Sequence, residues 1–181
     1  MKRVPLTTFS IVSLILTLTS APVSSSLVNC PPARVDGKTV GKIKVGKTIV
    51  NVKNVDYPAG KVLNPPKSPL NAGVSIRHQP LSADSGSSIV VWHINYNGCQ
   101  GKLNVINNKK RGYEFTVTDE RGVDTTYEVS KKFQVKKGKY DPDWFMLSGP
   151  RQLVLVTCIG KVIKGSYEDN LVIIATPVSD V

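Results

Sequence analysis

Residues Arg151–Ala175 constrain the fold of this chain most strongly, because they predict two apolar strands joined by a polar, glycine-containing loop. Five consecutive apolar or β-branched residues, Leu153–Thr157, are typical of a strand buried on both faces. Cys158 follows this run directly, where the predicted strand ends. A thiol in such a place is held rigidly while its sulfur faces the loop, as a nucleophile requires. The ordinary alternative is a buried cysteine that serves as a small apolar side chain.

Most of the remaining chain also has the pattern of strands. Ser88–Trp92 predicts a second buried strand, and it ends at His93. Asp141–Leu147 predicts a single helical turn. Further strands are predicted at residues 39–45, 49–55, 113–117 and 125–135, separated by turns rich in Gly, Pro and Asn. About eight short strands and almost no helical periodicity predict an all-β barrel or sandwich.

The amino end has the pattern of an export signal. Lys2 and Arg3 precede an apolar run at Phe9–Leu18, and small residues follow at Ser20–Ser26. The apolar run is short for a membrane span, which favours a cleaved signal peptide over an anchor. The predicted organisation is therefore a leader at 1–26, a linker at 27–38 and one domain at 39–181.

Charge and cysteine content restrict the partners that the chain could bind. The formal net charge is +11, and lysines crowd residues 131–139. This pattern suits an anionic wall polymer or membrane surface, although a solvated, solubilising face is the ordinary explanation, and no nucleic-acid partner is expected. The chain has three cysteines, of which Cys30 and Cys99 could pair and leave Cys158 free. Two histidines and the lack of a Cys-x-x-Cys motif argue against a zinc site.

Several stretches resemble the sortases, a family of cell-surface cysteine transpeptidases. Val154–Cys158 (VLVTC) is similar to the family signature TLxTC, and Tyr167–Ala175 (YEDNLVIIA) looks like the class F form of the family. Val91–Asn95 (VWHIN) is similar to the histidine motif AGHVD. The resemblance covers roughly residues 39–178.

This resemblance implies a closed or nearly closed sortase-type β-barrel with Cys158 as the nucleophile and His93 as its imidazole partner. Without Cys158, His93 would be read as a hydrogen-bonded core histidine, and His78 lies in a loop-like segment. The implied partners are a protein that carries a sorting motif and an amine acceptor, and no cofactor is implied. The implied location is the outer face of the membrane or the cell wall, with the protein anchored or secreted.

The chain departs from the family pattern in one place. Class F sortases carry an arginine before the final strand, whereas this chain has Glu168 there, and no arginine follows Cys158. Lys161 or Lys164 could take over its role, and each is also an ordinary loop lysine. The departure leaves a second hypothesis, a catalytically degenerate sortase-fold module that binds a peptide or an anionic wall polymer. A third hypothesis is a basic surface protein that binds a polyanion through residues 131–139.

Overall fold

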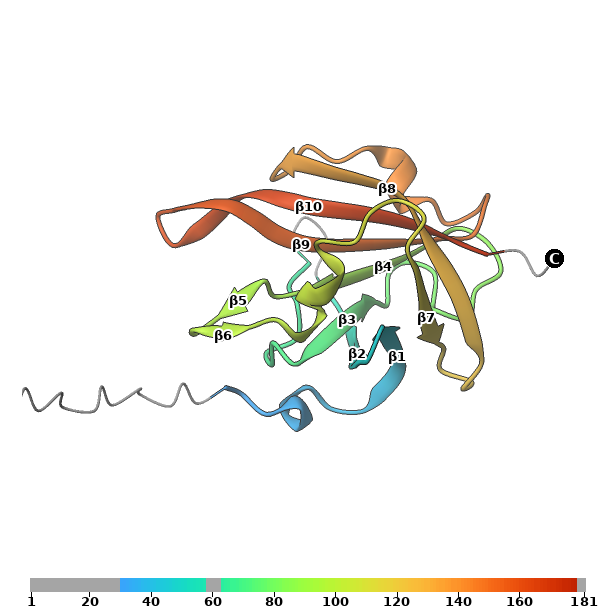
Figure 1. The fold of residues 1–181 in the computed structure, drawn as a ribbon, viewed down its shortest axis with the longest axis horizontal. Helices are drawn as coiled ribbons and strands as arrows, with labels where there is room; N and C mark the ends of the chain where they lie inside the picture. Colours follow the sequence, from blue (N-terminus) through green and yellow to red (C-terminus); the bar gives the residue numbers. More distant parts are fainter. Residues whose placement is uncertain (1–29, 58–62, 179–181) are drawn as a thin grey trace, which may run out of the picture.

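Eight strands close into a β-barrel in the computed structural model, which describes residues 30–57 and 63–178 (Figure 1). The strand order around the barrel is β1-β2-β3-β4-β9-β10-β8-β7. These strands are β1 (Thr39–Val45), β2 (Thr48–Val55), β3 (Asn71–Ser75), β4 (Ser87–Trp92), β7 (Glu114–Thr118), β8 (Asp124–Lys136), β9 (Gln152–Ile163) and β10 (Ser166–Pro177). The predicted all-β barrel is confirmed.

Most neighbouring strands are antiparallel, but two pairs are parallel, β2 with β3 and β4 with β9. Parallel neighbours need a long connection, because the chain must return to the same end of the sheet. The connection from β4 to β9 carries β5 (Asn95–Tyr96), β6 (Cys99–Gln100), η2 (Lys102–Ile106), the β7–β8 hairpin and η3 (Pro142–Phe145). The short helix η3 confirms the predicted helical turn.

Apolar side chains pack on both faces of the sheet formed by β4, β9 and β10. Leu153 and Leu155 belong to the core inside the barrel, whereas Val154 belongs to a smaller cluster outside it. This division follows from the alternation of side chains along a strand. Trp144 of η3 covers the outer cluster, so β9 is buried on both faces as its apolar run predicts.

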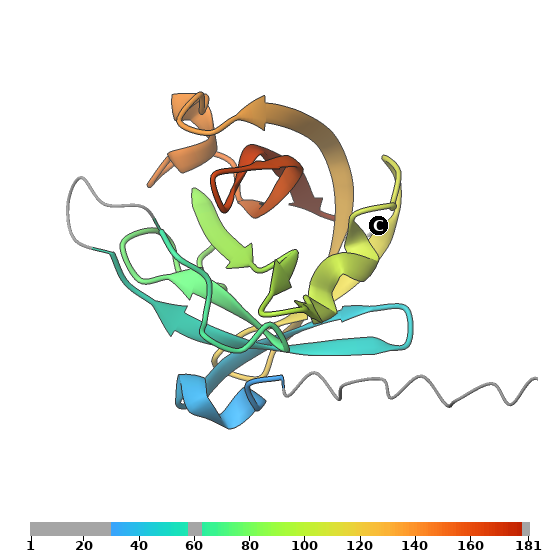
Figure 2. The same ribbon diagram turned by 90° about the vertical axis from the view of Figure 1, so that its left-hand side faces the viewer.

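The prediction that the strand ends at Cys158 is wrong, since β9 continues to Ile163. What ends after Thr157 is the pairing with β4, whose last residue Trp92 lies opposite Thr157. Beyond that point β9 still pairs with β10, through Ser166 opposite Ile163. The β9–β10 hairpin therefore extends past the rest of the barrel, and Figure 2 views the molecule from that end.

The segment before β1 is attached to the barrel by a disulfide and a set of hydrogen bonds. Cys30 bonds Cys99 of β6, with 5.7 Å between their Cα atoms, so the pairing left open by the sequence is formed. The next residues include a short helix, η1 (Ala33–Asp36). No helix in residues 30–57 and 63–178 is long and apolar enough to cross a membrane. The predicted leader lies outside the described residues.

Candidate active site

The register of two parallel strands brings Cys158 and His93 to the same edge of the barrel. Trp92 lies opposite Thr157, and the Thr157 hydroxyl donates a hydrogen bond of 2.8 Å to the Trp92 carbonyl. His93 directly follows the end of β4, and Cys158 is the next residue of β9. Adjacent strands lie about 4.8 Å apart, so the two backbones are close neighbours at this point. Alternation along β9 directs Cys158 to the outer face of the sheet, since Leu155 packs in the inner core and Val156 packs against the outer cluster.

Cys158 is partly buried and free, unlike the other two cysteines. Asn170 of β10 lies directly opposite it in the antiparallel ladder. Opposite residues of an antiparallel pair share a face, with their Cβ atoms about 5 Å apart. The Asn170 amide is therefore a nearest polar neighbour of the thiol.

The His93 imidazole is half-buried and stacks on Tyr96, with 4.6 Å between the ring centroids. Burial lowers the pKa of His93 below its ordinary value, while a hydrogen bond with the Pro66 backbone and the negative charge of Asp36 partly oppose this shift. Burial has the larger effect on the pKa, so the imidazole is mostly neutral near pH 7. A neutral imidazole can take the proton of a neighbouring thiol.

Asp36 links the segment before β1 to the loop that carries Pro66. Its carboxylate accepts hydrogen bonds from the backbone N–H groups of Lys67 at 2.6 Å and Ser68 at 3.0 Å, and from the side chain of Asn71 at 2.7 Å. These bonds hold the loop against the barrel next to His93. Asp36 thus holds in place the loop whose Pro66 backbone makes a hydrogen bond with His93.

Glu168 does not extend freely toward the thiol, because its carboxylate pairs with Lys136 of β8 at 3.1 Å. Lys136 also pairs with Asp169 at 2.8 Å. Lys161 and Lys164 are exposed on the outer part of the β9–β10 hairpin. Arg151, at the other end of β9, donates to the Leu81 carbonyl at 3.0 Å.

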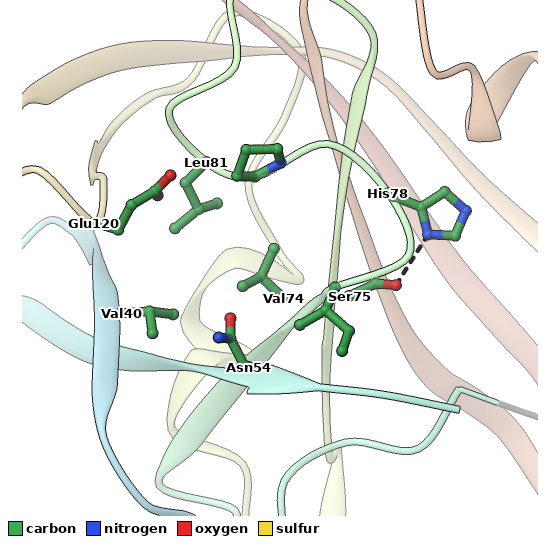
Figure 3. A pocket seen from close by; sticks show the side chains of 9 residues that line it. Val40, Asn54, Val74, Ser75, His78, Leu81 and Glu120 are labelled. Atoms are coloured by element: carbon green, nitrogen blue, oxygen red, sulfur yellow. Dashed lines mark hydrogen bonds between the residues drawn. The ribbon is translucent and has the colours of Figure 1, made fainter. Parts of the chain in front are cut away.

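His78 lies away from this edge, in the connection between β3 and β4. Its ring bonds the hydroxyl of Ser75 at 3.0 Å and lines a cavity of about 360 Å³ with apolar side chains of β1 and β3 (Figure 3). The structure therefore brings only His93 of the two histidines to the region of Cys158. Within the described part of the chain, no three His, Cys, Asp or Glu side chains are grouped to hold a metal ion.

Sequence reasoning did not identify Asn170, Tyr140, Asp36 or Pro66 as neighbours of this site. The Tyr140 hydroxyl donates to Oδ1 of Asn170 at 2.9 Å, from a connection that has no sequence motif of its own. Asn170 is part of the Tyr-Glu-Asp-Asn stretch, but its place opposite Cys158 depends on the hairpin register. The polar sequence of residues 166–170 is the one signal that could have drawn attention to it.

Comparison with known proteins identifies one family by sequence and similar folds among solved structures. The family model described as a sortase domain matches residues 42–178. No curated protein sequence matches this chain.

Solved sortase structures share the fold at low sequence identity. Sortase C1 of Streptococcus agalactiae, in complex with MTSET, has a TM-score of 0.60 and 13% identity, covering 79% of this chain and 70% of that one. Sortase C-1 of Actinomyces oris has a TM-score of 0.61 and 18% identity, with 81% and 76% covered. Sortase A of Corynebacterium diphtheriae has a TM-score of 0.61 and 13% identity, with 80% and 62% covered.

Proposed function

The chain belongs to the sortase family, and we propose that it is an exported cysteine transpeptidase in which Cys158 is the nucleophile and His93 the general acid and base. The substrate is a protein that carries a sorting motif, and the acceptor is an amine, or water when no amine is present. The observation that carries this proposal is the β4–β9 register, in which His93 and Cys158 each follow one residue of the pair Trp92–Thr157.

The reaction proceeds in two acyl transfers. The Cys158 sulfur attacks the carbonyl carbon of the scissile peptide bond, after giving its proton to His93. The tetrahedral intermediate collapses when the carbon–nitrogen bond breaks and His93 protonates the departing amine. The resulting thioester is then attacked by the acceptor amine, which gives its proton back to His93 and releases Cys158.

We further propose that the chain is of the class F type, with Glu168 at the position of the family's arginine. The class F assignment is supported by the Tyr167–Ala175 stretch. The placement of Glu168 at the arginine position is supported by the absence of any arginine after Cys158. Export is supported by the Cys30–Cys99 disulfide, because disulfides persist mainly in oxidising compartments. The domain boundaries follow from the same proposal, with a leader at 1–26, a linker at 27–38 and the catalytic domain at 39–181.

A second candidate function, a degenerate sortase-fold module that binds a peptide or an anionic wall polymer, is favoured by Glu168. A carboxylate at the position of a cation would oppose a developing oxyanion if it faced the thiol. Its ion pair with Lys136 weakens this objection, because the negative charge is partly compensated. The enzyme is therefore the leading proposal.

The experiment is the trapping of a covalent adduct on Cys158 with a panel of LPxTG-like peptides, measured by intact-protein mass spectrometry. The wild-type protein should gain the mass of the acyl fragment, whereas Cys158→Ala and His93→Gln should gain none or far less. His78→Gln is the matched control, because His78 lies away from the site, and it should acylate like the wild type.

Failure of the folded wild-type protein to form an adduct with any peptide would contradict the enzyme proposal. Peptide binding that survives Cys158→Ala would then favour the binding module. Binding to an anionic wall polymer that survives the same substitution and weakens steeply with salt would favour the polyanion hypothesis.

A further inference from the structure

Asn170 is the polar side chain that faces Cys158 across the β9–β10 ladder, and it is almost fully buried, with 6% of its surface exposed. Its Nδ2 donates a hydrogen bond of 3.0 Å to the carbonyl of Thr157, the residue before the nucleophile. Its Oδ1 accepts a hydrogen bond of 2.9 Å from the Tyr140 hydroxyl. The carbonyl partner can only accept, so it defines which end of the amide is nitrogen.

Both ends of this amide are thus held in place beside the thiol. A primary amide nitrogen carries two hydrogens, and the Thr157 carbonyl takes one of them. The second hydrogen makes no hydrogen bond with residues 30–57 or 63–178, so an acceptor that arrives at Cys158 can take it.

Tyr140 is itself anchored by aromatic packing. Its ring makes edge contacts with Trp144 and Phe145 of η3, at centroid distances of 6.4 Å and 5.9 Å. Burial raises the pKa of the Tyr140 hydroxyl, and the negative charge of a Cys158 thiolate raises it further, although a hydrogen bond with the Gly138 backbone opposes the shift. The hydroxyl is therefore protonated at neutral pH, so it donates to Asn170.

The cationic side chains Lys136 and Arg151 and the hairpin lysines are either paired with other groups or lie away from Cys158. Lys136 pairs with Glu168 and Asp169, and Arg151 donates to the Leu81 carbonyl at the other end of β9. The exposed lysines of the hairpin lie beyond Asn170 along the strands. The neutral amide of Asn170 is therefore the hydrogen-bond donor that the β9–β10 strand pairing places opposite Cys158.

We propose that Asn170 donates the hydrogen bond that stabilises the oxyanion formed when Cys158 attacks a carbonyl, and that Tyr140 is the positioning residue that fixes the Asn170 amide. When the sulfur–carbon bond forms, the π electrons of the carbonyl move onto its oxygen. The Asn170 N–H donates a hydrogen bond to this oxyanion. The electron pair then re-forms the carbonyl double bond as the bond to the leaving group breaks. This inference rests on the proposed function. It assigns to Asn170 the stabilisation of the oxyanion that an arginine provides in the family pattern.

Two reactions of the Cys158 thiol distinguish oxyanion stabilisation by Asn170 from a purely structural role of that side chain. Acylation by p-nitrophenyl acetate passes through an oxyanion, since the sulfur–carbon bond forms before p-nitrophenolate leaves. Alkylation by iodoacetamide displaces iodide in one step and forms no oxyanion.

Both rates are measured on the full chain for wild type, Asn170→Ala and Tyr140→Phe. Asn108→Ala and Tyr167→Phe are the matched controls, because Asn108 is exposed and Tyr167 lies on β10 near Asn170.

Asn170→Ala should slow acylation by about 10²–10³-fold, the usual loss for one oxyanion donor, while alkylation changes little. Tyr140→Phe should slow acylation by about tenfold, as expected for one lost hydrogen bond, again with alkylation preserved. The two control variants should acylate like the wild type. Thermal melting identifies any variant that fails to fold. If Asn170→Ala does not fold, the test is decided by Tyr140→Phe, which removes a single oxygen atom.

Equal losses of acylation and alkylation, or no loss in either, would overturn the role of Asn170. Peptide adducts on the wild type separate this inference from the proposed function. If peptides acylate the wild type but Asn170→Ala acylates equally fast, the inference fails and the function stands. If no peptide acylates the wild type while the ester reaction still depends on Asn170, the function fails and the inference stands.

Discussion

His93 and His78 both have a pKa below the ordinary value of 6.5, because burial disfavours the charged imidazole. Each side chain therefore binds a proton more weakly in the folded protein than in the unfolded chain. As the pH falls below about 6.5, the unfolded chain takes up protons that the folded protein does not, so stability is lost. Above that pH both states are neutral at these groups and the stability is fully present.

We expect the urea midpoint of the wild type to fall between about pH 7.5 and about pH 5.5, and to fall less in a His78→Gln/His93→Gln variant. Asp56, Asp119 and Asp169 have a lowered pKa, so their contribution is lost only as the pH falls below their ordinary value of 3.8. They do not affect this window. If the urea midpoint of the wild type and that of the His78→Gln/His93→Gln variant fell equally, the loss of stability could not be assigned to the two histidines.

At the scale of structural elements, the start of η2 presses against the end of β4. A Cβ atom on Gly101 would lie 1.7 Å from the carbonyl oxygen of His93, closer than any side chain can approach. The Gly101 N–H also donates to the Ile94 carbonyl at 3.1 Å. This close approach requires glycine and couples η2 to the position of His93.

Gly101→Ala should therefore lower the free energy of unfolding by about 1–3 kcal/mol, the usual cost of overpacking, and should reduce Cys158 acylation. Urea unfolding and the rate of acylation by p-nitrophenyl acetate provide the two measurements. Gln100→Ala, an exposed neighbour, is the control and should change neither. A Gly101→Ala protein as stable and as active as the wild type would show that η2 does not constrain His93.

The disulfide joins two other elements, the segment before β1 and strand β6. Cys30 and Cys99 are 69 residues apart in sequence, so the bond closes a long loop in the unfolded chain. A Cys30→Ser/Cys99→Ser variant should lose about 2–4 kcal/mol of stability. The measurement is urea unfolding, with Cys158→Ala present in all proteins to prevent new pairings. An unchanged midpoint would mean that the Asp36 hydrogen bonds alone are enough to hold the segment.

At the scale of the whole molecule, two apolar clusters share the strands β4, β9 and β10. Trp92 lies in the inner core and Trp144 in the outer cluster, so each reports on one face of the same sheet. Neither cluster can come apart without disrupting the pairing of β4, β9 and β10. The domain should therefore unfold in a single transition.

Trp92→Phe leaves Trp144 as the fluorescent probe, and Trp144→Phe leaves Trp92. In each variant the urea curve followed by fluorescence should coincide with the curve followed by far-UV circular dichroism. An earlier fluorescence change in Trp92→Phe alone would show that η3 detaches before the barrel opens.

The sequence alone predicted much of the architecture, because strand periodicity is a local property of the chain. The alternating residues 39–55, the buried run Leu153–Thr157 and the helical turn near Trp144 all lie where they were predicted. Cys158 and His93 were also chosen from the ends of apolar runs. The leader at 1–26, the class F assignment and the roles of both residues stay predictions.

Tertiary structure decided the surroundings of the thiol, because strand register depends on pairing between distant segments and on the length of turns. A shift of one residue in the β9–β10 ladder would turn Asn170 to the opposite face, away from Cys158. In the same way, the parallel pairing of β4 with β9 joins Trp92 to Thr157, positions 65 residues apart, and so brings the backbone of His93 to the same edge of the barrel as Cys158. The continuation of β9 to Ile163 has the same origin, since a strand extends as far as a partner strand supplies hydrogen bonds.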